Sequence, residues 1–185
     1  MKEAMRLFIN AMEVIFYRRS IRSYTGEMPS DDALDRILKA VYASPVGMGR
    51  YDSLHVTVVK NRDFLNRLEA AAGAQLGKEN YHPLYGAPVL LIFSSVFPGI
   101  PTDNSSYSNC AILSQNAALA AVSLGLGACH IWGAIRALNK EPSMLAELNL
   151  PEGFLPCCAL ALGRTQEVYE ARAVKDGRIE TRTME

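Results

Sequence analysis

The chain has 185 residues, a length that suits one domain with a hydrophobic core of its own. Lys and Arg together number 19, as do Asp and Glu, so the formal net charge is zero and no global basic field exists to bind nucleic acid or an anionic membrane. Hydrophobic residues make up 49% and charged residues 21%, a balance that argues against extended disorder.

The cysteines and histidines give no pattern for a metal site or a disulfide framework. The 4 cysteines form no CxxC pair and lie in apolar stretches, and the 3 histidines are scattered along the chain. A structural zinc site needs four thiolate or imidazole ligands at tight spacing. We therefore expect buried free thiols in a reduced cytosol, and no bound metal.

The first part of the chain predicts two helices. The opening residues mix acidic, basic and apolar side chains and form neither a signal peptide nor a membrane span, so we expect a cytoplasmic protein. Apolar residues at a 3.6-residue period predict a helix over residues 3–17. A second helix should begin after Pro29, with Ser30 as its N-cap, and end before residues 44–49, which contain proline and glycine. Its expected core face consists of Leu34, Ile37, Leu38 and Val41.

Three strands are predicted, and each is largely apolar. Residues 54–59 are rich in β-branched side chains, and residues 88–93 and 154–162 are apolar runs typical of buried strands. Because helices and strands do not alternate strictly, the pattern predicts an α+β fold, with helices around a small central sheet and residues 1–185 as one domain. The remaining predicted segments are short helices at residues 62–72 and 143–148, a stretch of mixed turn and helix character at residues 131–138, and a loop at residues 98–106.

One expected helix has no solvent face. From Ser108 to Leu124 nearly all side chains are small or apolar, so this helix must be central. It is packed closely by neighbouring elements, by a second subunit, or by both, and the last is favoured. The tail, residues 164–185, is polar and has little to bury alone, so we expect it to run across another surface.

The sequence Arg18-Arg19-Ser20-Ile21-Arg22-Ser23-Tyr24 is the sharpest candidate site. Three guanidinium groups and a hydroxyl within five residues suit a phosphate monoester, which needs cationic donors and a neutral donor. The alternative is that the arginines complement the negative C-terminal end of the preceding helix. Capping needs only one or two arginines, so both interpretations stay open.

Two glycine-containing segments are weaker candidates. Gly125-Leu126-Gly127 lacks the third glycine and the preceding strand of a dinucleotide fingerprint, so these glycines are expected to allow a turn or the close approach of something flat. Trp132, the only tryptophan, stands beside Gly133. Such an aromatic can line a flat ligand, although a place in the core is the favoured interpretation.

Side-chain catalysis finds no support. No GxSxG motif is present, and no acid is placed near a serine and a histidine. His130 is expected to be a structural histidine with satisfied hydrogen bonds. Cys129 and Cys157 are expected to be buried, which argues against a nucleophilic thiolate.

Four features follow one another along the chain: the segment 18–24, Ala43-Ser44-Pro45, the small-residue helix running into Gly125-Leu126-Gly127-Ala128, and Leu160-Ala161-Leu162-Gly163 before a basic tail. Taken together and in order, they resemble the FMN-dependent nitroreductase family, over about residues 14–178. The resemblance implies a nitroreductase-like fold with a mostly antiparallel central sheet, in a domain-entwined homodimer that holds FMN at its interface. It also implies an enzyme that passes hydride from NAD(P)H through flavin N5 to nitroaromatics, quinones or flavins by a ping-pong mechanism.

The resemblance also assigns positions in the site. No side chain is expected to act as a catalytic acid or base, because flavin N5 carries the chemistry. Arg18, Arg19 and Ser20 are implied to hold the phosphate and ribityl chain, and Arg22 to lie at the N1–O2 edge of the ring, where reduction places negative charge. The remaining implied cofactor contacts are the loop residues Pro45, Val46 and Gly47, a backbone N–H from Trp132 or Gly133 to N5, and the tail residues Lys175 and Arg178, with Arg164 as their rival.

The loop after Pro45 departs from the family pattern. The family has an asparagine and a Gln-Pro-Trp run there, whereas residues 46–54 read Val-Gly-Met-Gly-Arg-Tyr-Asp-Ser-Leu. Backbone amides of residues 47–49, or the Arg50 side chain, are the candidate replacements. The departure leaves two alternatives to the reductase: a flavin-binding protein without NAD(P)H turnover, and a specialised reaction such as reductive dehalogenation or flavin fragmentation.

Overall fold

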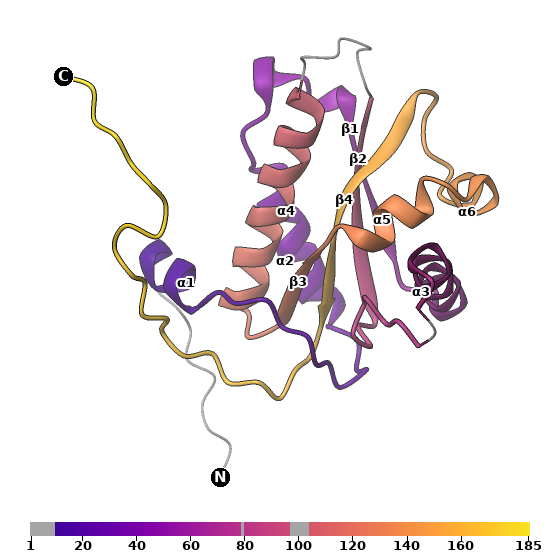
Figure 1. Ribbon diagram of the computed structural model, residues 1–185, viewed down its shortest axis with the longest axis horizontal. Coiled ribbons are helices and arrows are strands. Elements are labelled where there is room, and N and C mark those ends of the chain that lie inside the picture. The colour runs from indigo at the N-terminus through magenta and orange to yellow at the C-terminus, as the bar shows by residue number, and fades with distance from the viewer. Residues whose placement is uncertain (1–9, 79, 97–103) are drawn as a thin grey trace.

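The computed structural model describes residues 10–78, 80–96 and 104–185. Its centre is a four-stranded sheet in the order β1-β2-β4-β3, in which every neighbouring pair is antiparallel (Figure 1). This architecture confirms the predicted α+β class with a small antiparallel sheet. The strands are β1 (Leu54–Val59), β2 (Val89–Val96), β3 (Gly127–Ile131) and β4 (Phe154–Gly163).

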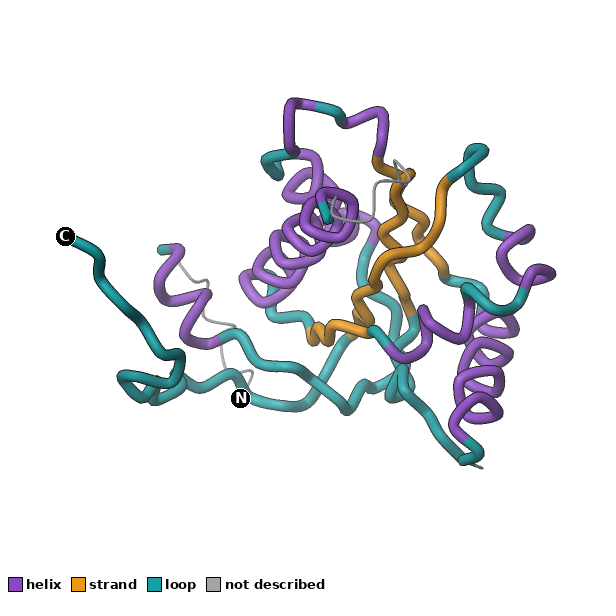
Figure 2. Tube along the Cα trace, turned by 45° about the horizontal axis from the view of Figure 1, so that its top comes forward, coloured by secondary structure: helices purple, strands orange, loops and turns teal. Residues whose placement is uncertain are grey.

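Helices cover both faces of the sheet, as Figures 1 and 2 show. One layer holds α2 (Asp31–Tyr42) and α4 (Ser105–Ser123), and the other holds α3 (Arg62–Leu76), α5 (Gly133–Leu138) and α6 (Pro142–Glu147). Two short 3₁₀ turns, Gly47–Gly49 and Tyr51–Ser53, precede β1. Helix α1 (Ala11–Tyr17) lies beside the body, next to the C-terminal tail.

The two-layer covering explains the continuous apolar run of β2. Leu90 and Ile92 pack into the core under α3 and α5, while Leu91 and Phe93 pack into the core under α2 and α4. Because side chains alternate between the faces of a strand, a strand buried on both faces needs apolar residues at every position. The strand over 54–59 has its predicted bounds, and the predicted 154–162 extends by one residue in β4.

Helix α2 begins as its sequence predicts. The Ser30 side chain accepts a hydrogen bond from the Ala33 N–H (3.2 Å), which satisfies one of the free donors of the first turn. Of the expected core face, Leu34, Ile37 and Val41 are buried, whereas Leu38 is half-buried.

Helix α4 is central, as its composition predicts. It packs against α2 and against β2, β3 and β4, and the methyl groups of Ala117, Ala118 and Ala121 are buried at these contacts. Small side chains let the helix axis approach its neighbours closely. On its remaining surface Ile112 is partly exposed.

Several boundary expectations need correction. The strand expected over residues 88–93 is β2, which runs from Val89 to Val96. The segment that forms strand β3 was expected to be a helix end and a turn. The strand forms because residues 127–131 pair with β4, and a segment of this length is too short to show an alternation of apolar and polar side chains. Helix α3 runs one turn past residue 72, and α4 begins at Ser105, inside the predicted loop. The expected helical residues 3–9 and loop residues 98–103 lie outside the described part of the chain.

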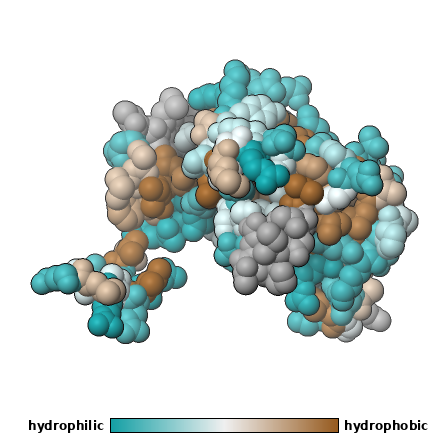
Figure 3. Space-filling model, turned by 90° about the horizontal axis from the view of Figure 1, so that it is seen from above, coloured by the Kyte–Doolittle hydropathy of each residue, from teal (hydrophilic) through white to brown (hydrophobic). Residues whose placement is uncertain are grey.

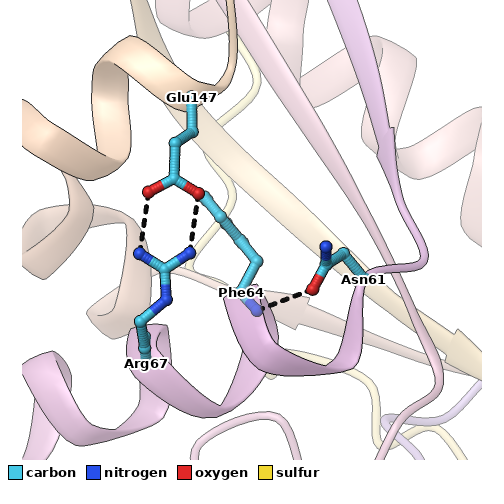
Figure 4. Close-up of polar contacts among 4 residues, drawn as sticks. All are labelled: Asn61, Phe64, Arg67 and Glu147. Atoms are coloured by element: carbon cyan, nitrogen blue, oxygen red, sulfur yellow. Dashed lines mark hydrogen bonds and ion pairs between the residues drawn. The ribbon is translucent and has the colours of Figure 1, made fainter.

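An ion pair joins the two helices α3 and α6. The Arg67 guanidinium donates two hydrogen bonds to the Glu147 carboxylate, at 2.7 and 2.6 Å, and Figure 4 shows the two groups facing each other. Asn61 caps the start of α3 by accepting from the Phe64 N–H (3.0 Å). The pair is exposed to solvent, so it fastens α6 to α3 only weakly.

The Arg67–Glu147 pair predicts a small pH dependence of stability. The hydrogen bonds from Arg67 lower the pKa of Glu147 in the folded protein. A lowered folded pKa means that the contribution is present above the ordinary glutamate value of about 4.3 and is lost as the pH falls through the lowered value. The difference in urea stability between wild type and Glu147→Gln should therefore be larger at roughly pH 7 and shrink as the pH falls below about 4.3. A difference that does not change with pH would contradict this.

Candidate functional site

The arginine segment, residues 18–24, is an extended strap that leaves α1 and crosses the edge strand β3. The Ile21 N–H donates to the Ala128 carbonyl (3.0 Å), and the Ile21 side chain is fully buried. The Tyr24 hydroxyl donates to the Ala161 carbonyl on β4 (3.2 Å). A Cβ atom on Gly127 would lie 2.9 Å from Ile21 Cγ2 and 3.0 Å from the Tyr24 ring. Gly127 thus allows the close approach of something flat, which is the Tyr24 ring of this strap.

The end of α1 is capped by an arginine that the sequence analysis did not single out. Arg172 of the tail donates to the carbonyls of Phe16 (3.2 Å) and Ile15 (3.1 Å). Its backbone N–H also donates to Phe16 (3.1 Å). The guanidinium groups of the arginine segment are therefore not needed to satisfy these carbonyls, which weakens the capping interpretation.

The arginine segment concentrates positive charge. Arg18, Arg19 and Ser20 are half-buried, and Arg22 is exposed. Burial lowers the pKa of Arg18, and the nearby Arg172 lowers it further. Within the described residues, no carboxylate lies at ion-pairing distance from Arg18, Arg19 or Arg22. Half-buried cations that repel one another form a site that an anion would stabilise.

Two ionisable residues of β3 lie next to this charge. Burial raises the pKa of the Cys129 thiol, although Arg22, Ser20 and Arg18 act in the opposite direction. Burial and the charge of Arg18 lower the pKa of His130. These directions favour a neutral thiol and a neutral imidazole.

His130 is the structural histidine that the sequence predicts. Its Nδ1 lies 2.9 Å from the Ser114 hydroxyl and its Nε2 lies 3.2 Å from Gln115 Oε1, so both ring nitrogens have partners on α4. Cys129 and Cys157 are buried free thiols, as expected, and so are Cys110 and Cys158.

The second candidate region is the loop at residues 44–49, which two asparagines of α4 hold in place. Asn116 donates to the Ser44 hydroxyl (2.9 Å), and Asn109 accepts a hydrogen bond from the Gly47 N–H (3.1 Å). Pro45 and Gly47 are exposed between these anchors and Val46 is half-buried. The sequence analysis missed both asparagines; their signal is that they are polar residues in an otherwise small and apolar helix.

Trp132 and Gly133 follow β3 at the start of α5. Trp132 is 52% exposed, so the favoured core interpretation is wrong and its indole faces solvent. Gly133 is also exposed, and within the described residues no side chain caps the first turn of α5. The backbone N–H groups at this corner are available to a ligand.

The tail places its basic residues in different surroundings. Lys175 and Arg178 are exposed and flank a turn at Gly177, on the far part of the tail. The Arg164 guanidinium lies 3.5 Å from the Glu27 carboxylate. Arg164 lines a hollow beside the start of α2, away from the turn that carries Lys175 and Arg178. The charge of Arg172 acts on Arg18, and the backbone carbonyl of Arg164 accepts a hydrogen bond from the Thr25 N–H (3.0 Å), just past the arginine segment.

The candidate residues therefore form two groups in one chain. The arginine segment and the Trp132 corner both adjoin β3, whereas the loop at residues 44–49 is fixed to α4 through Asn109 and Asn116 (Figure 1). Lys175 and Arg178 belong to neither group. Within the described residues, no group of three His, Cys, Asp or Glu side chains forms a candidate metal site, and no helix is long and apolar enough to cross a membrane.

The matching family model decides the classification: the model of the nitroreductase family covers residues 15–164. The chain belongs to the nitroreductase family. The match spans the arginine segment, the loop, α4, β3 and β4, and ends just after the last strand.

Individual relatives agree with this membership. A nitroreductase from Desulfitobacterium hafniense, solved with bound FMN, superposes with a TM-score of 0.82 at 27% identity, covering 95% of this chain and 100% of that one. A nitroreductase from Bacteroides fragilis with bound FMN has a TM-score of 0.78 at 28% identity, with the same coverage. A Methanothermobacter thermautotrophicus protein, provisionally named NADH dehydrogenase/NAD(P)H nitroreductase, is 32% identical over 167 residues, which is 86% of this chain and 79% of that protein.

Proposed function

We propose that this nitroreductase-family chain is an FMN-dependent oxidoreductase of the cytoplasm. It would take electrons from NAD(P)H and pass them to small electron-poor acceptors, such as nitroaromatics, quinones or free flavins, in a ping-pong cycle. The observation that carries the proposal is that the half-buried Arg18 and Arg19 have no carboxylate at ion-pairing distance among the described residues, in a chain whose fold matches two structures with bound FMN. When bound, FMN supplies the hydride chemistry at its N5 atom.

The arginine segment fits the phosphate of FMN. Arg18 and Arg19 offer guanidinium donors and Ser20 a neutral hydroxyl, which is the donor set that a phosphate monoester prefers. A dianion beside Arg18 would also offset the repulsion between Arg18 and Arg172. The burial of these groups strengthens their attraction for an anion, because the local dielectric constant is lower than that of water.

The residues beyond the phosphate site suit the flavin ring. Arg22 follows Ser20 along the strap, and its exposed guanidinium would face the N1–O2 edge and stabilise negative charge there. The backbone N–H of Trp132 or Gly133 would donate to N5. The exposed Trp132 indole would border the space where a flat acceptor binds.

The second group of site residues would come from a second copy of the chain. The loop with Pro45, Val46 and Gly47 would reach the flavin of the partner in a homodimer with two-fold symmetry. Residues 164–185 would lie over the partner and carry Lys175 and Arg178 to a phosphate site. In support, this tail carries unburied apolar side chains such as Ile179 (80% exposed) and Met184 (87% exposed), and Figure 3 shows it projecting from the body.

One alternative keeps a specific observation in its favour. The loop after Pro45 lacks the asparagine and the Gln-Pro-Trp run, and Met48 at its tip is 88% exposed with a left-handed backbone (φ 55°). A changed loop at the flavin suits a specialised reaction, such as reductive dehalogenation or flavin fragmentation, on the same scaffold. Product analysis with candidate acceptors separates this alternative from general reduction.

A comparison of FMN with riboflavin tests the assignment of the phosphate site. Each charge-assisted hydrogen bond contributes about 1.5–3 kcal/mol, so FMN should bind about 100-fold more tightly than riboflavin. The affinities can be measured by titration of the apoprotein, followed through flavin fluorescence. Equal affinity for the two flavins would contradict the proposed role of Arg18, Arg19 and Ser20.

A further inference from the structure

Tyr85 has a backbone conformation that aromatic residues rarely adopt. Its φ is +56°, in the left-handed region, and Gly86 follows with φ +79°. Two turns hold this segment: the Tyr85 N–H donates to the His82 carbonyl (3.1 Å), and the Ala87 N–H donates to the Leu84 carbonyl (3.0 Å). Glu69 of α3 fixes it further by accepting from the Leu84 N–H (2.9 Å). A strained backbone of this kind persists only where its surroundings enforce it, and such residues cluster at functional sites.

This conformation places the Tyr85 side chain at the arginine segment. The guanidinium carbon of Arg22 lies 5.9 Å from the centroid of the Tyr85 ring, within the range of a cation–π contact. A hydrogen bond to Tyr85 also raises the pKa of Arg22. The ring itself is half-buried and packs against the core under α3 and α5, so it is a fixed surface for a mobile cation.

Among the described residues Arg22 forms no ion pair, although Glu167 attracts its charge from farther away. Arg22 is exposed and lies on an extended strap. A free arginine side chain samples many rotamers, and ordering it on binding costs entropy. Contact with the rigid Tyr85 ring reduces that cost and fixes the direction of the charge.

We propose that Tyr85 is a positioning residue for Arg22, and that it thereby sets how much more tightly the site holds reduced flavin than oxidised flavin. The inference rests on the proposed function, because it places Arg22 at the N1–O2 edge of the ring. Tyr85 acts through Arg22 and need not touch the cofactor. Its effect belongs to the charge that develops on reduction, so it is expected in the reduction potential more than in the affinity for oxidised FMN.

The test is a double-mutant cycle on the FMN-loaded protein, with the midpoint potential and the Kd for oxidised FMN as readouts. Tyr85→Asn removes the ring, and asparagine tolerates the left-handed backbone better than most residues do. We expect it to weaken the binding of reduced flavin about tenfold more than that of oxidised flavin, a fall of about 30 mV for a two-electron couple. Tyr85→Phe keeps the ring and should produce a smaller fall in the same direction.

The remaining arms separate positioning from general damage. Arg22→Ala should lower the potential by itself, and adding Tyr85→Asn to it should change little more, because the two residues act as a unit. Arg67→Ala is the matched control, since Arg67 makes the same kind of contact with Phe64 (5.7 Å) away from the site, and it should leave the potential unchanged.

The outcomes for this inference and for the proposed function are distinguishable. A wild-type protein that binds no flavin overturns both. A flavin-loaded protein in which Tyr85→Asn keeps the wild-type potential, or shifts it equally with and without Arg22, overturns the role of Tyr85 alone.

Discussion

Replacing Arg18 with alanine is expected to weaken FMN binding by about 10- to 100-fold, because one charged donor set to the phosphate is lost. The same change should leave the unliganded protein at least as stable as wild type. Arg18 is half-buried beside Arg172 and has no acidic partner within the described residues, so removing it relieves both burial of charge and repulsion. Opposite effects on binding and stability distinguish a ligand site from a structural arginine.

The measurement combines flavin titration with thermal unfolding of the apoprotein. Arg36→Ala is a suitable control, since Arg36 is an exposed arginine on α2, outside the arginine segment, and it should change neither quantity appreciably. If Arg18→Ala bound FMN as tightly as wild type, or if it unfolded the apoprotein, Arg18 would be a structural residue.

Gly163→Ala is expected to destabilise the fold by about 3 kcal/mol, near the upper end for overpacking a core. A Cβ atom at this position would lie 2.5 Å from Pro88 Cδ and 3.0 Å from the Tyr24 ring. The Pro88 ring is closed onto its own backbone and cannot rotate away, and Gly163 ends β4 in the buried part of the sheet. The collision would also push Tyr24 outward and loosen the arginine segment, so weaker FMN binding should accompany the loss of stability.

Urea unfolding measures the effect, with an unchanged m-value showing that the folded and unfolded states remain comparable. Gly133→Ala serves as the stability control, because its Cβ would meet only the Tyr81 hydroxyl oxygen at an ordinary 3.7 Å. A Gly163→Ala protein as stable as Gly133→Ala would show that Pro88 and Tyr24 do not pack against Gly163 as described.

The elements with strong local signals are those that the sequence predicts well. The β-branched run at residues 54–59 forms the half-buried strand β1, the apolar runs form the buried strands β2 and β4, and Ser30 caps α2. Strand β3 escaped prediction because five residues that start at a glycine have no visible period, and its pairing with β4 is a tertiary effect. Trp132 was expected in the core because the sequence does not show that this residue directly follows an edge strand.

For the site, the sequence identifies the charges but not their surroundings. The segment from Arg18 to Arg22 is conspicuous in the sequence. Arg172, which donates to the last carbonyls of α1 in place of that segment, lies more than 150 residues further along the chain. Tyr85 gives no local signal, because its strained backbone and its contact with Arg22 exist only after folding. Long-range partners and backbone strain are properties of the folded chain, and a single sequence does not display them.

The central claim, an FMN-dependent oxidoreductase, is tested most directly by the visible absorption of the purified protein before and after anaerobic addition of NADH or NADPH. The account predicts oxidised-flavin bands that survive desalting, disappear when a nicotinamide donor is added, and return with a quinone or nitroaromatic acceptor. A protein that stays colourless after incubation with FMN and desalting would contradict the assignment of the arginine segment. Bound flavin that neither donor bleaches would instead indicate a flavin-binding protein without NAD(P)H turnover.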